Sequence, residues 1–254
     1  MLTKIKYPLI LDGGLSNVLE AFGCDLNHTL WSAKLLIDQP EIILRAHLAY
    51  LEAGANCIST AGYQASIEGF MKTGSSVIEA ENLILRSVEL AEEAREIFLR
   101  NKNLKKKIYV AASMGPYGAI LADGSEYHGD YSITEKALSD FHAKRIKLLA
   151  STKADFFAFE TIPSMMEVKI LSDLLNFSTK PSWVSFSCKD EFHLNDGNKI
   201  NEAAKLLENN SEVFAIGVNC TSPKYISAII DVIKQAAPKK KIIVYPNSGE
   251  VYHV

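Results

Sequence analysis

A cysteine that directly follows a short apolar run is the first group in this sequence that could do chemistry. Residues 213–218 are mostly apolar and lead through Asn219 to Cys220, and such a run is typical of a strand buried on both faces. Cys220 would then lie at a strand's C-terminal end, where parallel α/β proteins bind ligands. Because Ser222 can cap a helix and Pro223 suits its first position, we expect nearby backbone N–H groups that favour a thiolate. The alternative is a small buried cysteine that only packs.

Other polar and reactive side chains also follow apolar runs. They are Asp12, Tyr63, Tyr117, Glu160, Cys188, Asn247 and Ser248. In a barrel, the loops that carry such residues share one mouth. A buried Asp and Glu beside aromatic rings suit a substrate with an amino group, because carboxylates pair with ammonium and rings attract cations. Taken singly, each residue has a structural explanation: Asp12 could form an Asp-Gly turn, and Glu160 could be an ordinary strand-end carboxylate.

Seven short apolar runs alternate with segments of helical periodicity. The expected strands are residues 7–11, 55–59, 108–113, 155–159, 183–187, 213–218 and 242–245. The expected helices are residues 40–53, 79–100, 134–150, 200–207 and 223–237, with one more opened by a capping box from Ser164 to Glu167. Alternation of this kind indicates a parallel sheet with helices outside it.

The regular spacing of these runs predicts an α/β fold of the (β/α)8 TIM-barrel type. From Leu9 to Ile242 there are six steps, and (242 − 9)/6 gives about 39 residues per step. An open doubly wound sheet is the alternative, although no G-x-G-x-x-G run follows the first strand. An eighth strand–helix unit would need roughly 40 to 50 further residues. We therefore expect this unit to be missing, and residues 1–254 to form a single barrel domain that is incomplete at its C-terminus.

Composition and charge exclude several classes of partner. The formal net charge of −3 over 254 residues argues against a nucleic-acid-binding or membrane-surface role. No segment approaches the roughly 20 apolar residues that a membrane span needs. The four cysteines are far apart and not in paired spacings, which favours a reducing cytoplasm over a disulfide scaffold.

Eight short runs, spread in order over almost the whole chain, form a further pattern. The first four are Leu11-Asp12-Gly13-Gly14, Leu30-Trp31-Ser32-Ala33, Gly62-Tyr63-Gln64-Ala65-Ser66 and Gly115-Pro116-Tyr117-Gly118-Ala119. The others are Asp123-Gly124-Ser125-Glu126-Tyr127, Glu160-Thr161-Ile162-Pro163, Gly217-Val218-Asn219-Cys220 and Tyr245-Pro246-Asn247-Ser248-Gly249-Glu250. Together they resemble the homocysteine S-methyltransferases, close to the S-methylmethionine-dependent branch.

The resemblance implies a (β/α)8 barrel with one zinc ion held by three cysteines, of which Cys220 matches the first. Asp12 and Glu160 match positions that hold the amino end of homocysteine, and Trp31 and Tyr63 match residues near the methyl donor. Gly13 lets the backbone approach a ligand closely. The expected substrate-binding set is Asp12, Gly13, Trp31, Tyr63, Glu160 and Asn219, with Cys220 as the metal ligand.

Thiolate chemistry follows from these ligands. A free thiol has a pKa of about 8.5, and only its thiolate attacks. Zinc deprotonates a thiol that coordinates it, and catalytic zinc keeps one position open for substrate. The homocysteine sulfur would attack the methyl group of a sulfonium donor and give methionine. The donor carries its own leaving group, so no residue is expected to act as a general acid or base.

The sequence departs from the family at its C-terminal end. The family's other two zinc cysteines form an adjacent pair in a Gly-Gly-Cys-Cys run after strand eight, and Cys24, Cys57 and Cys188 do not match them. The chain is therefore expected to be either a fragment or a relative without activity, which would bind an amino acid or a partner without zinc chemistry. S-Methylmethionine is the favoured donor and S-adenosylmethionine the second, with betaine or a folate less favoured. Selenocysteine could replace homocysteine, and the oligomeric state is not readable.

Overall fold

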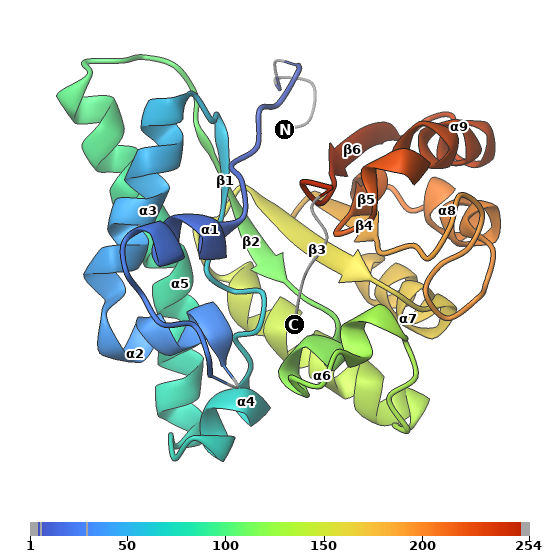
Figure 1. Ribbon diagram of the computed structural model, residues 1–254, viewed down its shortest axis with the longest axis horizontal. Coiled ribbons are helices and arrows are strands. Elements are labelled where there is room, and N and C mark those ends of the chain that lie inside the picture. Colours follow the sequence, from blue (N-terminus) through green and yellow to red (C-terminus); the bar gives the residue numbers. More distant parts are fainter. Residues whose placement is uncertain (1–4, 6, 29, 250–254) are drawn as a thin grey trace. The chain divides into compact units, whose positions relative to one another are not determined.

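A computed structural model describes residue 5 and residues 7–28 and 30–249 of the chain. The chain divides into two compact units, which we describe separately (Figure 1). Unit 1 comprises Met1–Met114 and Arg145–Phe157, and unit 2 comprises Gly115–Lys144 and Ala158–Val254. Helix α6 (Glu135–Ala150) and strand β3 (Phe156–Ile162) each contribute residues to both units.

In unit 1, strands β1 (Cys57–Ser59) and β2 (Tyr109–Met114) pair in parallel, with Cys57 opposite Tyr109. The strand expected at residues 7–11 is reduced to a single bridge between Leu11 and Cys57. Two features account for this difference. Pro8 has no N–H to donate to a ladder, and the N–H of Ile10 donates to the Asn56 side chain at 2.8 Å.

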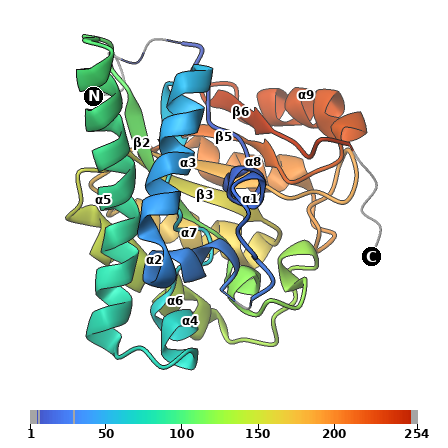
Figure 2. The same ribbon diagram turned by 60° about the vertical axis from the view of Figure 1, so that its left-hand side comes forward.

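The helices of unit 1 include both long helices that the sequence predicts. Helix α3 (Pro40–Ala53) has the predicted bounds, and α5 (Val77–Asn101) begins earlier than expected because Ser76 and Glu79 form a complete capping box. Figures 1 and 2 both show α3 and α5 lying side by side. Three short helices were not predicted; they are α1 (Leu15–Ala21), α2 (Leu35–Asp38) and α4 (Ile67–Lys72).

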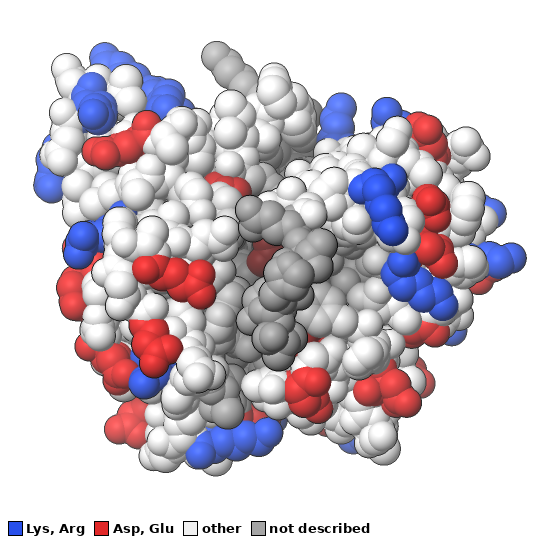
Figure 3. Space-filling view, in the orientation of Figure 1, with Lys and Arg blue, Asp and Glu red and all other residues white. Residues whose placement is uncertain are grey.

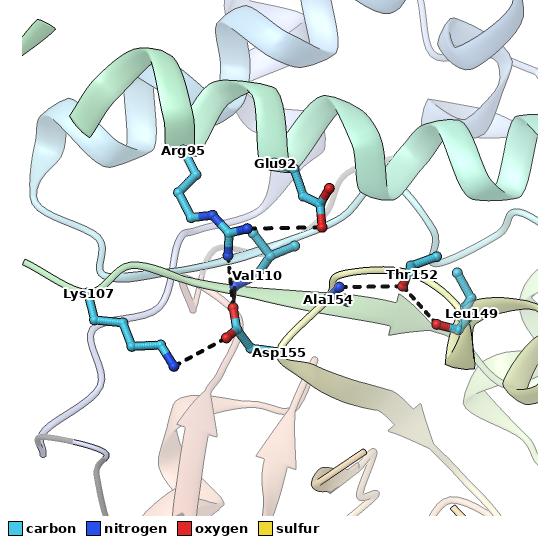
Figure 4. Close-up of polar contacts among 8 residues, drawn as sticks. All are labelled: Glu92, Arg95, Lys107, Val110, Leu149, Thr152, Ala154 and Asp155. Carbon is cyan, nitrogen blue, oxygen red and sulfur yellow. Dashed lines mark hydrogen bonds and ion pairs between the residues drawn. The ribbon is translucent and has the colours of Figure 1, made fainter. Parts of the chain in front are cut away.

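A largely buried carboxylate, that of Asp155, joins β2, α5 and the start of β3 within unit 1 (Figure 4). One oxygen of Asp155 accepts hydrogen bonds from the Arg95 guanidinium at 2.9 Å and from the Val110 N–H at 3.0 Å. Its backbone N–H donates to the Val110 carbonyl at 2.7 Å. Lys107 lies 3.4 Å from its other oxygen. This group fixes the N-terminal ends of two strands, the end that carries stability rather than chemistry in α/β barrels.

In unit 2, strands β4 (Ser182–Phe186), β5 (Val213–Asn219) and β6 (Lys241–Tyr245) are successive parallel neighbours. All seven residues of β5 are buried, as its apolar run predicts. A Cβ at Gly217 would lie 1.6 Å from the carbonyl oxygen of Ile243, so glycine permits the close approach of β5 and β6. Strand β3 runs further than expected, and Glu160 therefore lies inside a strand instead of beyond its end.

Helices α7 (Met165–Leu175), α8 (Ile200–Glu208) and α9 (Ile226–Ala236) lie outside β4, β5 and β6 in Figure 1. The helix expected at residues 223–237 is divided into a short 3₁₀ turn, η5 (Pro223–Tyr225), and α9. Two further 3₁₀ turns, η3 (Tyr117–Ile120) and η4 (Ser125–Tyr127), belong to the loop that follows β2.

The capping box expected at α7 is only half formed. The Ser164 hydroxyl accepts the Glu167 N–H at 3.3 Å, but the Glu167 side chain does not return to the start of the helix. It is fully buried and accepts hydrogen bonds from the Tyr117 N–H and the Tyr131 hydroxyl, each at 2.8 Å, and lies 2.8 Å from His142. Tertiary partners have overridden the local capping pattern.

The described part of the chain thus contains six strands in sequence order, separated by helices, which is an α/β fold. Closure into a barrel, and the missing eighth unit, stay predictions. Among the described residues, no helix is both long enough and apolar enough to cross a membrane. Acidic and basic side chains are interspersed on the face drawn in Figure 3.

Candidate substrate site

The candidate site of unit 2 is built around Cys220, directly after β5. Cys220 has a φ of +46°, in the left-handed region that residues with a side chain rarely adopt. Its sulfur accepts hydrogen bonds from the Asn219 amide at 3.3 Å and from the Thr161 hydroxyl at 3.5 Å. Thr161, in β3, also has a left-handed backbone, with a φ of +62°. The thiol is thus held by donors from two separate strands.

Asn219 locks the ends of β3 and β5 together. Its side-chain oxygen accepts the Thr161 N–H at 2.7 Å, and its amide nitrogen donates to the Thr161 hydroxyl at 2.8 Å. The Ser185 hydroxyl of β4 donates to the same oxygen at 2.8 Å. Asn219 is only 3% exposed, so these bonds satisfy polar groups that water does not reach.

Glu160 is the carboxylate of this site, and it is 8% exposed. The Tyr245 hydroxyl, from β6, donates to it at 3.0 Å. The same hydroxyl accepts the Trp183 indole N–H at 3.1 Å and lies 2.7 Å from the Ser185 hydroxyl. Burial raises the pKa of Tyr245 well above its ordinary value, and the charge of Glu160 raises it further. Tyr245 therefore stays protonated and can donate.

The electrostatics around Cys220 differ from those expected from the sequence. Burial raises the pKa of the Cys220 thiol, the charge of Glu160 also raises it, and the hydrogen bonds from Thr161 and Asn219 oppose these effects. The expected lowering by a helix N-terminus is wrong: Ser222 makes no side-chain cap at η5, and burial is the largest effect on this thiol. In this protein environment the thiol form is favoured.

Two neighbouring side chains were not predicted as site residues. Tyr127 is 50% exposed, and the partial burial of its side chain raises its pKa to about 12, with the charges of Cys220 and Glu126 adding to this effect. One oxygen of Glu126 is buried and has no hydrogen-bond partner within the described part of the chain, and burial raises the pKa of this carboxyl. Both belong to the run 123–127, and Tyr245 begins the run 245–250, of which Glu250 lies outside the described residues. Membership of these two runs is the sequence signal that could have identified Glu126, Tyr127 and Tyr245 as site residues.

Cys188 does not join Cys220 in a ligand cluster. It is 7% exposed, its N–H donates to the Thr221 hydroxyl at 3.0 Å, and burial raises the pKa of its thiol. Within residues 7–28 and 30–249, no three His, Cys, Asp or Glu residues are grouped so that they could hold a metal ion. Cys220 is therefore a single candidate ligand, and the described residues alone do not form a zinc site.

Unit 1 holds the other expected residues. Asp12 accepts the N–H of Ser59, the last residue of β1, at 2.7 Å. Gly13 is exposed, and a Cβ there would lie 2.8 Å from the hydroxyl of Tyr50, which itself donates to the Gly14 carbonyl at 2.7 Å. Burial raises the pKa of Tyr50, and the charge of Asp12 adds to the effect. Asp12 is thus fixed at the C-terminal end of β1.

The two aromatic residues expected near the methyl donor are also in unit 1. Trp31 begins the 3₁₀ turn η2 (Trp31–Lys34) with a φ of +45°, and its side chain is partly buried. Tyr63 lies in the loop after β1 and is also partly buried. The structure thus brings Glu160, Asn219 and Cys220 together in unit 2. The joint placement of the two groups of residues stays a prediction.

The family model for homocysteine S-methyltransferase matches residues 9–254. Homocysteine S-methyltransferase 3 of Arabidopsis thaliana is 48% identical over 96% of this chain and 74% of its own length. Homocysteine S-methyltransferase YbgG of Bacillus subtilis is 47% identical, over 97% and 79%. Selenocysteine Se-methyltransferase of Brassica oleracea var. italica is 46% identical, over 96% and 73%.

The solved structures agree with the sequences. The metallated form of the homocysteine methyltransferase MmuM from Escherichia coli matches with a TM-score of 0.92 and 40% identity, covering 98% of this chain and 86% of that one. Its apo form matches with a TM-score of 0.81 and 34% identity, over 98% and 85%. The fold, the site residues of unit 2 and these matches lead to one conclusion. The chain belongs to the homocysteine S-methyltransferase family of methyl-transferring enzymes.

Proposed function

We propose that this chain transfers a methyl group from a sulfonium donor to the thiolate of homocysteine, giving methionine. S-Methylmethionine is the first candidate donor and S-adenosylmethionine the second. The observation that carries the proposal is the hydrogen-bonded network of unit 2, in which Glu160 and Cys220 are held by connected side chains. A carboxylate suits the ammonium end of an amino acid, and a thiol at a strand end suits a metal that binds sulfur.

Each expected residue has a proposed role at the substrate. Glu160 and Asp12 pair with the ammonium group of homocysteine, and Gly13 allows the backbone to approach it. Trp31 and Tyr63 present ring faces to the sulfonium, an attraction worth roughly 0.5 to 2 kcal/mol. Asn219 orients Cys220 by donating to its sulfur at 3.3 Å. No general acid or base is assigned, because a sulfonium donor brings its own leaving group.

Zinc dependence is part of this proposal, with Cys220 as a metal ligand. A bound zinc ion would lower the pKa of the homocysteine thiol, so that the thiolate is present at neutral pH. Since Cys220 is a single candidate ligand among the described residues, we assign no step of the reaction to the metal. Selenocysteine is a second candidate acceptor, because one relative is named selenocysteine Se-methyltransferase.

Methionine formation tests the proposal directly. The chain is incubated with L-homocysteine and either S-methylmethionine or S-adenosylmethionine, with and without added zinc, and methionine is measured by chromatography. We expect methionine with S-methylmethionine and zinc. Its absence with both donors, in this chain and in a version extended by the C-terminal segment of MmuM, would overturn the proposal.

The alternative is a relative that binds an amino acid without zinc chemistry. The single candidate ligand, Cys220, is the observation that favours it. Elemental analysis separates the two functions: stoichiometric, tightly held zinc supports the enzyme, whereas homocysteine binding without zinc or turnover supports the alternative.

A further inference from the structure

The hydroxyl group of Tyr245 is a meeting point of three side chains in unit 2. It lies 3.0 Å from a carboxylate oxygen of Glu160, 3.1 Å from the indole nitrogen of Trp183 and 2.7 Å from the Ser185 hydroxyl. Tyr245 is the last residue of β6 and the register partner of Asn219 in β5. Strand pairing, rather than a flexible loop, therefore sets the position of this hydroxyl.

The chemistry of the donors fixes the direction of the hydrogen bond to Glu160. An indole N–H can only donate, and an ionised carboxylate can only accept. The Tyr245 oxygen therefore accepts from Trp183. Its single hydrogen could go to Glu160 or to Ser185. The charged carboxylate is the stronger acceptor, so Tyr245 donates to Glu160. A hydrogen bond to a charged acceptor is roughly twice as strong as one between neutral groups, so this contact holds one carboxylate oxygen of Glu160 in place.

The same hydroxyl is connected to the thiol. The Ser185 hydroxyl lies 2.7 Å from the Tyr245 hydroxyl and 2.8 Å from the Asn219 amide oxygen. Its one hydrogen can be donated to one of these two oxygens at a time. Asn219 in turn donates to the Cys220 sulfur at 3.3 Å. Residues of three neighbouring strands, β4, β5 and β6, thus connect the carboxylate to the thiol through direct contacts. The two groups that would bind opposite ends of one amino acid share a single support.

We propose that Tyr245 is a positioning residue that holds the Glu160 carboxylate toward the ammonium group of the amino-acid acceptor and, through Ser185 and Asn219, keeps it in register with Cys220. This role rests on the function proposed above. This role predicts that Tyr245 affects the binding of ligands with an amino group and not of ligands without one. Loss of the Tyr245 hydroxyl weakens the recognition of an ammonium group and leaves the recognition of a thiol alone.

Calorimetric binding of two ligands tests this role. One is L-homocysteine, and the other is 4-mercaptobutanoate, which lacks the amino group but keeps the thiol and the carboxylate. In Tyr245→Phe we expect homocysteine to bind about tenfold more weakly, with a change of less than about twofold for 4-mercaptobutanoate. Tyr131→Phe is the matched control, because it also removes a tyrosine hydroxyl from a buried carboxylate of unit 2, that of Glu167. It should leave both affinities unchanged.

A double-mutant cycle with Glu160→Gln identifies the route of the effect. If Tyr245 acts through Glu160, Tyr245→Phe adds no further loss of homocysteine binding in the Glu160→Gln background. If circular dichroism shows that Tyr245→Phe does not fold, Trp183→Phe replaces it. This variant removes the indole N–H that donates to the Tyr245 hydroxyl. It should weaken homocysteine binding by less than Tyr245→Phe and leave 4-mercaptobutanoate binding unchanged.

Each remaining outcome has one meaning. An unchanged affinity of Tyr245→Phe for homocysteine, or an equal loss for both ligands, overturns the positioning role and leaves the proposed function intact. If neither the unsubstituted chain nor the version extended by the C-terminal segment of MmuM binds homocysteine, the proposed function fails and the positioning role fails with it.

Discussion

Asn219 and Tyr245 are register partners on the parallel strands β5 and β6. The amide of Asn219 donates to the Cys220 sulfur, and the hydroxyl of Tyr245 donates to the Glu160 carboxylate. Neighbouring strands pair in a fixed register because the side chains alternate between faces with a period of two. The thiol and the carboxylate are therefore positioned by the backbone ladder of unit 2 itself.

Replacement of Asn219 by alanine should destabilise unit 2. The change leaves the buried Thr161 N–H, now 2.7 Å from the Asn219 oxygen, without an acceptor. We expect the free energy of unfolding to fall by about 2 to 3 kcal/mol, measured by urea denaturation. Asn209→Ala, at an exposed position after α8, is the control and should change it by less than about 0.5 kcal/mol. Equal effects of the two substitutions would contradict this interpretation.

His47 should make the stability of the chain sensitive to mild acid. It is fully buried in α3, neither ring nitrogen has a hydrogen-bond partner among the residues that the structure describes, and burial lowers its pKa from 6.5 to about 4. Below pH 6.5 the His47 ring takes up a proton in the unfolded chain but stays neutral in the folded chain. The free energy of unfolding therefore decreases as the pH is lowered from about 6.5 to about 4. The shift corresponds to about 3 kcal/mol.

The His47→Leu variant isolates this contribution. Its free energy of unfolding, followed by denaturation at several pH values, should lose about 3 kcal/mol less than that of the unsubstituted chain between pH 7 and pH 4. The exposed His128 provides the control, since His128→Asn should keep the full pH dependence. If His47→Leu and the unsubstituted chain lose the same free energy of unfolding between pH 7 and pH 4, His47 takes up its proton in the folded chain too, and the prediction is wrong.

Asp155 should contribute to stability and not to ligand binding. Asp155→Ala removes the acceptor of Arg95 and Val110 and leaves the largely buried Arg95 guanidinium with only the longer ion pair to Glu92, at 4.0 Å, which costs about 3 kcal/mol. Thermal unfolding measures this loss, and calorimetry should find the affinity for homocysteine unchanged. Asp140→Ala, which breaks the exposed pair with Lys136, should cost less than about 1 kcal/mol. Weakened homocysteine binding in Asp155→Ala would contradict a purely structural role.

Cys220 should determine any zinc that the chain retains. After the protein is loaded with zinc and passed through a desalting column, Cys220→Ser should hold at least about tenfold less zinc than the unsubstituted chain, because thiolates are preferred zinc ligands. Cys24→Ser, at a partly exposed position in unit 1, is the matched control and should retain the full amount. Equal zinc in both variants would remove Cys220 from the proposed metal site.

The sequence predicted those features that depend on local pattern. Helix α3 has the expected bounds, and the buried run of β5 delivers Cys220 to a strand end. Local pattern gave a wrong prediction where side chains distant in sequence compete for the same polar group. Glu167 has the spacing of a capping box, yet its carboxylate is taken by Tyr117, Tyr131 and His142.

The support of Glu160 could not be found from spacing. Tyr245 lies 85 residues from Glu160 in sequence, and the contact arises only through the register of β6 on β5. The strand expected at residues 7–11 failed for a related reason, since its N–H groups find a side chain and one bridge instead of a full ladder. Strand pairing is a property of the assembled sheet, which periodicity along one run does not contain.

Thr161 and Cys220 both have left-handed backbones, and neither residue type adopts them without strain, of the order of 1 kcal/mol or more each. Glycine would relieve the strain at either position but would remove the hydroxyl or the sulfur. Selection for heat resistance alone would therefore favour glycine at the two positions where the proposed chemistry needs a side chain. Thermostability and catalysis would thus favour different residues at these two positions.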